Sequence, residues 1–317
     1  MDWLKGIQFA QLVNAAYSKF EGQPYTTLGY NEVGTLYAND LATLKNPGRG
    51  RNRVIVGLVL QNDAGDAVLA FRGTEGIKEW VQDAEFLATP FREVPNGGQT
   101  EDGFTEMYRS TTVGDGAGAV RLLPALGGNL FSKPVTSITV AGHSLGGALA
   151  TVCALDVATN APEAFRNPTV FTYASPRTGD RTFAAAYSQR ITNTYRLVDN
   201  VDLVPKLPKP MLVPLITYMH VCAQIEMDSL TLIPPRALLQ PNPVCWHILS
   251  SYLYLMALAA ETPTQGPEPQ CVWAGLGKNI HEVLDIACAQ LSNEQQLKDR
   301  FFADPRKNMG ANRNGRT

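Results

Sequence analysis

The chain has 317 residues, 44% of them apolar, and its 27 basic residues nearly balance its 29 acidic ones, giving a formal net charge of −2. This balance gives no reason to expect a nucleic-acid partner. The length, with no charged or Ser/Gly-rich linker, predicts one α/β domain over residues 1–305, and the polar, basic residues 306–317 predict a disordered tail.

Hydrophobic periodicity in the first half of the chain predicts a helix and then a β-hairpin. Residues 2–18 alternate apolar and polar positions at helical spacing. They lack the basic start and continuous apolar core of a signal peptide, which favours a cytoplasmic protein, although a secreted chain shown without its leader would look the same. Two strands are predicted at 53–60 and 67–71, joined by a turn. Weaker helical patterns follow at 76–87, 104–112 and 114–128.

Strands and helices alternate in the second half. The pattern predicts strands at 135–140, 169–174, 191–198 and 219–227, and helices at 148–157, 181–188, 246–260 and 280–291. This alternation indicates a mostly parallel sheet with helices on both faces. The longest apolar stretch, residues 248–260, is too short to span a bilayer.

The cysteine pattern argues against a metal site and against a dense disulfide framework. The number is odd, the spacing is irregular and no C-x-x-C occurs among Cys153, Cys222, Cys245, Cys271 and Cys288. Cys153 falls in a predicted core helix. The sequence leaves open whether two of the later cysteines form a disulfide bond.

The most informative motif is Gly142-His143-Ser144-Leu145-Gly146. A β-branched run leads into it and an Ala- and Leu-rich helical run follows. A G-x-S-x-G nucleophile elbow requires this order of strand, turn and helix. The glycines let the strand and helix approach closely, and the N–H groups at the helix start favour a developing negative charge. The alternative is a glycine-rich turn carrying an ordinary serine.

A nucleophilic serine needs a base and an orienting acid, which follow it in the order Ser, Asp or Glu, His in this fold class. Asp199 and Asp202 both lie at the end of the strand predicted at 191–198. Either could instead be an Asx-turn or solvated loop carboxylate.

Four histidines compete for the role of the base. His143 precedes the serine and cannot stand third in the order. His220 falls inside a predicted strand, where a structural histidine is expected. His247 begins a helix after a proline-rich loop, which is a natural place for a base, and we favour it over His281.

An oxyanion hole needs two donors aimed at the developing charge. The residue after the nucleophile, Leu145, is expected to supply one N–H, and the loop after an early strand should supply the other. That loop is Phe71-Arg-Gly-Thr74, in which Gly73 permits close approach and Thr74 carries both an N–H and a hydroxyl.

Four segments together resemble the class 3 lipases of the α/β-hydrolase fold, the group containing the filamentous-fungal triacylglycerol lipases. They are Ala70–Thr74 with Trp80 and Asp83, Ala141–Gly147, Tyr173–Gly179, and Tyr195–Pro208. The resemblance implies that Asp202, which precedes a hydrophobic pair and a proline, is the catalytic acid, with Asp199 as the alternative. It also implies that His247 is catalytic and that His220 is not.

The same resemblance implies a lid just after the oxyanion threonine, for which residues 75–89 are the candidate. Ile77 and Trp80 on its apolar face, together with His143, are the expected lid and substrate residues. The alternative is a fixed surface helix with Trp80 in the core. The chain departs from the family at Thr100-Glu-Asp-Gly-Phe104, where acids stand in place of the histidine usual before Gly-Phe, so the elements behind the site are expected to differ.

These observations predict a serine ester hydrolase that cleaves acylglycerols or related esters through an acyl-enzyme, without metal or organic cofactor. The expected partners are an ester or lipid substrate and, transiently, a lipid interface. The sequence does not specify the oligomeric state. A feruloyl or different carboxylesterase, and a non-catalytic hydrolase-fold binding protein, are competing hypotheses, and the full Ser, Asp and His set argues against the binding protein.

Overall fold

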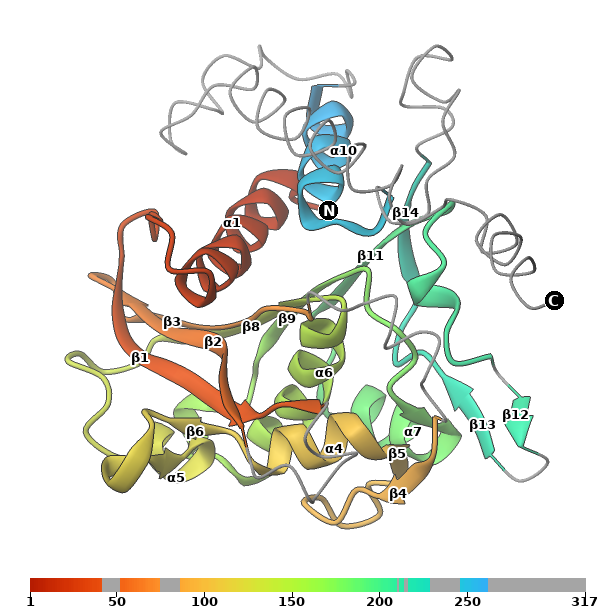
Figure 1. Ribbon diagram of the computed structural model, residues 1–317, viewed down its shortest axis with the longest axis horizontal. Helices are drawn as coiled ribbons and strands as arrows, with labels where there is room; N and C mark the ends of the chain where they lie inside the picture. The colour runs from red at the N-terminus through yellow and green to blue at the C-terminus, as the bar shows by residue number, and fades with distance from the viewer. Residues whose placement is uncertain (42–51, 75–85, 210, 214–215, 229–245, 262–317) are drawn as a thin grey trace, which may run out of the picture.

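The computed structural model describes residues 1–41, 52–74, 86–209, 211–213, 216–228 and 246–261. Its centre is a nine-stranded sheet (Figure 1). In spatial order the strands are β14 (Gln224–Met227), β11 (Thr194–Asp199), β9 (Thr169–Tyr173), β8 (Ser137–His143), β3 (Asp66–Phe71), β2 (Arg53–Asn62), β1 (Tyr30–Asn39), β6 (Thr112–Val113) and β7 (Val120–Arg121).

The sheet changes character at β3. From β3 to β14 every neighbouring pair is parallel, whereas from β3 to β7 every pair is antiparallel. The carboxyl ends of parallel strands meet at one edge, which is where open α/β sheets hold their sites. The loops after β3, β8 and β11 therefore converge at that edge.

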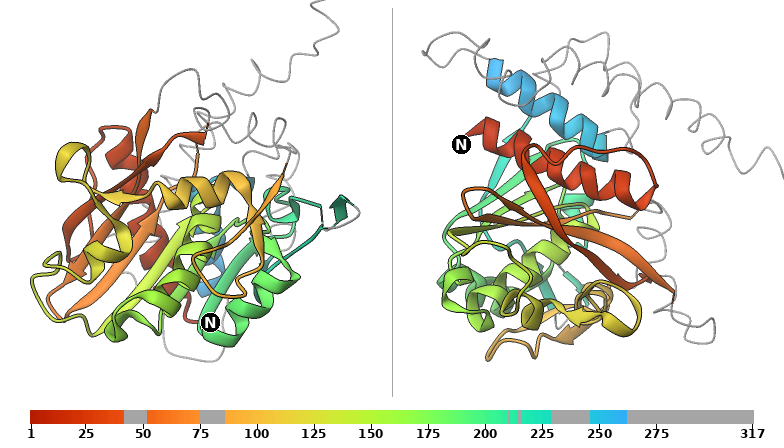
Figure 2. Two further views of the ribbon diagram at one scale, coloured as in Figure 1. Left: turned by 90° about the horizontal axis from the view of Figure 1, so that it is seen from below. Right: turned by 90° about the vertical axis from the view of Figure 1, so that its left-hand side faces the viewer.

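Helices cover both faces of the sheet, as the sequence predicts. On one face α1 (Trp3–Phe20) and α10 (Leu249–Glu261) pack side by side, and on the other lie α4 (Asp102–Arg109), α5 (Leu122–Leu126), α6 (Leu145–Asn160) and α7 (Arg181–Arg190) (Figures 1 and 2). Successive side chains of a strand point to opposite faces of the sheet, so each strand contributes to a hydrophobic core on both faces. Leu58 and Leu60 of β2 pack on the α1 side, and Val59 packs on the α6 side. α6 is buried along most of its length, so it lies in the core.

A smaller sheet flanks the central one. Its strand order is β12 (Met211–Val213), β13 (Ile216–Met219), β10 (Gly179–Asp180), β5 (Gln99–Glu101) and β4 (Ala88–Pro90). Short 3-10 turns at Gly116–Gly118, Glu163–Phe165 and Val204–Lys206 complete the described elements.

The structure confirms the predicted N-terminal helix and the β2–β3 hairpin, but three of the predicted elements differ, and β1 is not among the predicted elements. The single strand predicted at 219–227 is two strands, because β13 pairs with β10 in the small sheet and β14 pairs with β11 in the central one. The helix predicted at 104–112 is α4, which starts earlier because Glu101 caps it. Within 114–128 only α5 is α-helical.

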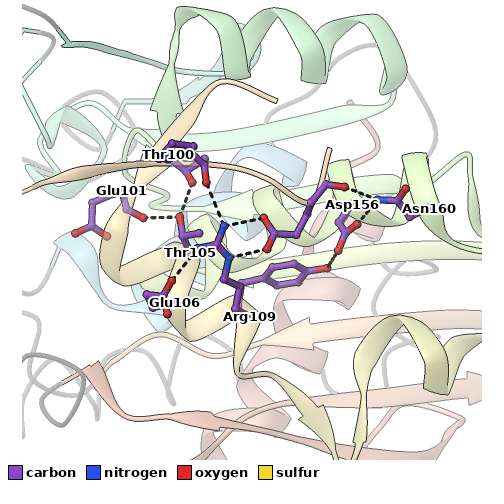
Figure 3. Close-up of polar contacts among 10 residues, drawn as sticks. Thr100, Glu101, Thr105, Glu106, Arg109, Asp156 and Asn160 are labelled. Carbon is purple, nitrogen blue, oxygen red and sulfur yellow. Dashed lines mark hydrogen bonds and ion pairs between the residues drawn. The ribbon is translucent and has the colours of Figure 1, made fainter. Parts of the chain in front are cut away.

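Glu101, at the start of α4, belongs to a polar cluster that also includes Asp156 of α6 (Figure 3). The Glu101 carboxylate accepts a hydrogen bond from the Phe104 N–H at 2.8 Å, so this acid serves as a helix cap. Asp156 of α6 accepts hydrogen bonds from Tyr108 and Asn160, each at 2.7 Å. Burial raises the pKa of the Asp156 carboxyl, and the bond from Tyr108 ties α4 to the far half of α6.

Several predicted features lie outside the described residues: positions 75–85 of the lid candidate with Ile77 and Trp80, Cys245, Cys271 and Cys288, and residues 262–317. Residues 88 and 89 of the lid candidate belong to β4. Cys153 and Cys222 are free thiols. Among the described helices, none has the length and apolarity needed to cross a bilayer.

We expect Gly142→Ala to destabilise the fold. A Cβ at Gly142 would overlap the backbone carbonyl of Gly146, so β8 and α6 would have to separate. Overpacking of this kind costs about 1–3 kcal/mol in the free energy of unfolding. Urea denaturation measures the loss, and Gly118→Ala is the control because a Cβ there meets nothing within 4 Å. Equal stability of the two variants would contradict the close-approach argument.

Candidate active site

Ser144 sits at a strained turn between β8 and α6. Its backbone has φ 58° and ψ −127°, a conformation that a residue with a side chain seldom adopts. Such strain costs of order 1–3 kcal/mol and persists only where the surroundings hold it. Here the Ser144 N–H donates to the Tyr173 carbonyl at 2.9 Å, and the Ser144 carbonyl accepts from the Gly147 N–H at 2.9 Å. The predicted elbow is therefore present, with its serine fixed on both sides.

The side chains of Ser144, His247 and Asp202 form one hydrogen-bonded chain. The His247 Nε2 lies 2.8 Å from the Ser144 Oγ, and the His247 Nδ1 lies 2.9 Å from the Asp202 Oδ2. All three residues are buried, with exposed fractions of 1%, 4% and 0% in the order Ser144, His247, Asp202. A base within hydrogen-bond reach of a serine, oriented by a carboxylate, is the arrangement that activates a serine nucleophile.

Two further donors hold the Asp202 carboxylate. The Val204 N–H donates to Oδ1 at 2.9 Å and the Tyr252 hydroxyl donates to Oδ2 at 2.9 Å. Burial and the neighbouring Asp202 carboxylate raise the pKa of the Tyr252 phenol well above its usual value, which keeps this hydroxyl a donor. The sequence does not single out Tyr252, because its position five residues after His247 carries no chemical signal of its own.

Of the two predicted acids, the structure brings Asp202 to His247. Asp199, the last residue of β11, is also buried, but its backbone N–H donates to the Tyr252 hydroxyl at 3.0 Å. The three-residue step past the strand end carries Asp202 to the imidazole. Asp199 thus supports the tyrosine that holds the acid.

The loop after Asp202 is clamped by side chains from other elements. The Arg177 guanidinium donates to the Lys206 carbonyl and, at 2.8 Å, to the Pro208 carbonyl. The His220 Nε2 lies 2.8 Å from the Pro205 carbonyl and donates to it. His220 falls between β13 and β14, not inside a strand as predicted, and it supports the loop that carries the acid.

The loop predicted to carry an oxyanion donor follows β3 directly. An ideal Cβ at Gly73 would lie 2.8 Å from the Ser144 Cβ, so Gly73 packs against the serine and only glycine fits there. The Arg72 guanidinium donates to the Gly73 carbonyl at 2.6 Å and to the Ile55 carbonyl at 2.6 Å. Thr74 follows Gly73, and Leu145 opens α6 on the other side of Ser144. Both predicted oxyanion residues therefore adjoin residues of the site.

The expectation that His143 is a lid or substrate residue requires a correction. Its ring is buried and both ring nitrogens are engaged inside the protein. Nδ1 lies 2.8 Å from the Tyr17 hydroxyl and Nε2 lies 2.7 Å from the His247 carbonyl. Burial and the neighbouring His247 hold the pKa of His143 well below its usual value, so it is a neutral structural ring. The alternative base His281 lies outside the described residues, as do Ile77 and Trp80.

The parallel sheet, the elbow and the Ser–His–Asp chain define a serine-hydrolase type of site on the α/β-hydrolase fold. Residues 68–211 match the family described as Lipase (class 3), and this match confirms the resemblance to the class 3 lipases seen in the sequence.

The chain is also similar to known lipases and phospholipases. Phospholipase A1-II 1 of Oryza sativa subsp. indica is 28% identical over 204 residues, which are 61% of this chain and 50% of that protein. The lipase of Rhizopus niveus is 30% identical over 154 residues, 48% of this chain and 37% of that protein. The structure of lipase II from Rhizopus niveus shares the fold, with a TM-score of 0.56, 21% identity and coverage of 72% of this chain and 81% of that one. The chain spans about half the length of the first of these relatives.

The clamp on the acid-bearing loop leads to a prediction on pH. Burial, together with the nearby Arg196 and Arg177, lowers the pKa of His220 from 6.5 to about 3. Between those values the unfolded chain binds a proton that the folded chain does not, so the free energy of unfolding falls as the pH falls. The slope from this residue is at most about 1.4 kcal/mol per pH unit. His220→Gln can keep the bond to Pro205 without titrating. As the pH falls, its free energy of unfolding should therefore decrease less than that of the parent.

Urea denaturation of the parent and of His220→Gln at several values between pH 7 and pH 4 measures this difference. His143 titrates equally in both proteins and cancels from the comparison. Parallel stability curves would show that His220 is not buried as a neutral ring.

Proposed function

We propose that the protein is a carboxylic ester hydrolase that cleaves acyl esters of glycerolipids through a serine acyl-enzyme. The observation that carries the proposal is the hydrogen-bonded chain from Ser144 through His247 to Asp202 at a strained elbow. The resemblance to lipases and phospholipases A1, which share an acyl-ester bond as their target, supports the substrate class.

The geometry supports a two-step acyl transfer. His247 Nε2 takes the proton of the Ser144 hydroxyl as Oγ attacks the ester carbonyl, and the resulting oxyanion lies near the N–H groups of Leu145 and Thr74. The ester C–O bond breaks as His247 returns its proton to the departing alcohol. Water then attacks the acyl-enzyme, with His247 as the base again, and releases the acid. Asp202 orients the ring and stabilises the imidazolium.

A non-catalytic binding function fits the structure less well. A pure binding protein has no need to keep a serine at φ 58° and ψ −127° or to keep its hydroxyl 2.8 Å from a histidine nitrogen. Backbone strain of this size is commonly retained where it serves chemistry. A feruloyl esterase and a glycerolipid hydrolase would use the same mechanism and differ in the ester that they accept, so a series of esters distinguishes them.

We expect Ser144→Ala to leave a folded protein whose turnover falls by at least about 10³-fold, because the base then has no nucleophile to activate. The assay is hydrolysis of p-nitrophenyl esters, with mass spectrometry of the protein after an organophosphonate. The parent should gain one phosphonyl group on Ser144. Ser188→Ala is the matched control, since that hydroxyl bonds to the Ala184 carbonyl on α7, outside the catalytic site.

The same assay, extended from acetate to long acyl chains and to emulsified triglyceride, phospholipid and feruloyl esters, tests the substrate class. Glycerolipid esters should be preferred. Preference for feruloyl esters would replace the proposed substrate, and an unlabelled, inactive parent protein would favour a binding function.

The acid is tested by a matched pair of variants. Asp202→Asn should lower kcat by about 10³–10⁴-fold, because a neutral amide favours the wrong imidazole tautomer and cannot stabilise the imidazolium. Asp199→Asn should keep kcat within about tenfold of the parent, since the Asp199 hydrogen bond to Tyr252 is made by a backbone N–H that the substitution retains. Circular dichroism of both variants checks folding. A greater loss of kcat in Asp199→Asn would reverse the assignment.

A further inference from the structure

Three hydrogen bonds join the oxyanion loop to the backbone of the catalytic histidine, and Tyr17 of α1 is the junction. The Gly73 N–H donates to the Tyr17 hydroxyl at 2.7 Å, that hydroxyl lies 2.8 Å from the His143 Nδ1, and the His143 Nε2 lies 2.7 Å from the His247 carbonyl. Gly73 packs against Ser144, and His143 directly precedes Ser144 in the chain. The chain of bonds therefore runs around the nucleophile.

The direction of every bond follows from what each group can do. A backbone carbonyl only accepts, so the His143 Nε2 must carry the proton that reaches His247. The neutral ring then leaves Nδ1 as an acceptor, so the Tyr17 hydroxyl donates to it. The same hydroxyl accepts from the Gly73 N–H. One tyrosine oxygen thus satisfies a donor on the oxyanion loop and an acceptor beside the nucleophile.

We infer that Tyr17 is a positioning residue that couples the oxyanion loop to His247 through His143. This inference rests on the proposed ester hydrolysis. Tyr17 touches neither Ser144 Oγ nor the reacting imidazole nitrogen in the hydrogen bonds described, so it acts through the backbone groups that it holds.

The loop end of this coupling is specific. Tyr17 holds the Gly73 N–H and Arg72 holds the Gly73 carbonyl at 2.6 Å, so both polar groups of this glycine are bound to side chains. The Gly73 carbonyl belongs to the same planar trans peptide as the Thr74 N–H, which points the opposite way. Fixing the glycine therefore fixes the direction of the predicted oxyanion donor.

The histidine end is equally defined. His247 lies two residues before α10 begins, and the bond to its carbonyl ties this segment to the residue next to the nucleophile. The rings of His143 and His247 lie 5.0 Å apart between centroids, close enough that His143 must stay neutral when His247 is protonated during catalysis. α1 packs beside α10, so Tyr17 and His247 come from neighbouring elements (Figures 1 and 2).

Tyr17→Phe removes the junction oxygen and keeps the ring. Misplacing a preorganised donor without deleting it should lower kcat by about 10–100-fold, less than the 10²–10³-fold loss of a whole donor, while KM stays within about twofold. The affinity for an alkylboronic acid, whose tetrahedral serine adduct mimics the transition state, should fall in parallel. Tyr187→Phe is the control, because it removes one hydroxyl bond between Tyr187 of α7 and Thr194 of β11, outside the site. Parent values of kcat and boronate affinity in Tyr17→Phe would overturn the inference.

Two variants of His143 separate the hydrogen bond to Tyr17 from the hydrogen bond to His247. His143→Asn can keep an acceptor near the Nδ1 position for Tyr17, and His143→Gln can keep a donor near the Nε2 position for His247. If Tyr17 acts through His143, the double variant Tyr17→Phe, His143→Gln should be no slower than its slower single variant. Additive losses would overturn the coupling.

Amide exchange keeps this test separate from that of the proposed function. In Tyr17→Phe the Gly73 amide should exchange at least about tenfold faster than in the parent, whether or not any ester is hydrolysed. Unchanged protection of Gly73 contradicts the inference. An inactive parent that binds no boronic acid contradicts the proposed function alone.

Discussion

The backbone conformation of Ser144 is the constraint on which the site depends. At φ 58° and ψ −127° the chain reverses between β8 and α6 within one residue, and the side chain is held clear of both. That reversal is possible only if strand, helix and the β3 end approach one another at backbone distance. Glycines 73, 142, 146 and 147 all stand where a Cβ would crowd a neighbouring group. The strained conformation of Ser144 therefore depends on several glycines that allow close packing around it.

Burial of the acid is the second demand on the fold. Taking an ionised carboxylate out of water costs several kcal/mol, and no exposed part of Asp202 recovers it. Three donors surround the carboxylate: the Val204 N–H, the Tyr252 hydroxyl and the His247 ring. Hydrogen bonds to charged groups contribute about 1.5–3 kcal/mol each, which is enough to offset a cost of that order. The site therefore surrounds a fully buried carboxyl group with three hydrogen-bond donors.

The sequence predicts the elements whose signal is local. The elbow at Ser144 and the loop at Gly73 each follow a strand that its own composition reveals, and the structure has both in place. The choice of Asp202 over Asp199 is different, because both lie past the same strand and only the family resemblance prefers one. The break between β13 and β14 has no local signal, since no glycine or proline marks it and it arises from two different strand partners. Tyr17 and Tyr252 cannot be found from sequence either, because their roles depend on residues far away along the chain.

The order of the site residues along the chain has a consequence for how the protein is made. The segment that matches the lipase family, residues 68–211, carries the nucleophile, the acid and the oxyanion loop, but the base comes 36 residues later. A growing polypeptide that has completed β11 still has an unactivated serine. The imidazole that contacts Ser144 comes from the segment just before α10, and α10 packs against α1 at the other end of the described residues. The Ser144–His247 hydrogen bond therefore joins parts of the chain that are completed at different times during synthesis.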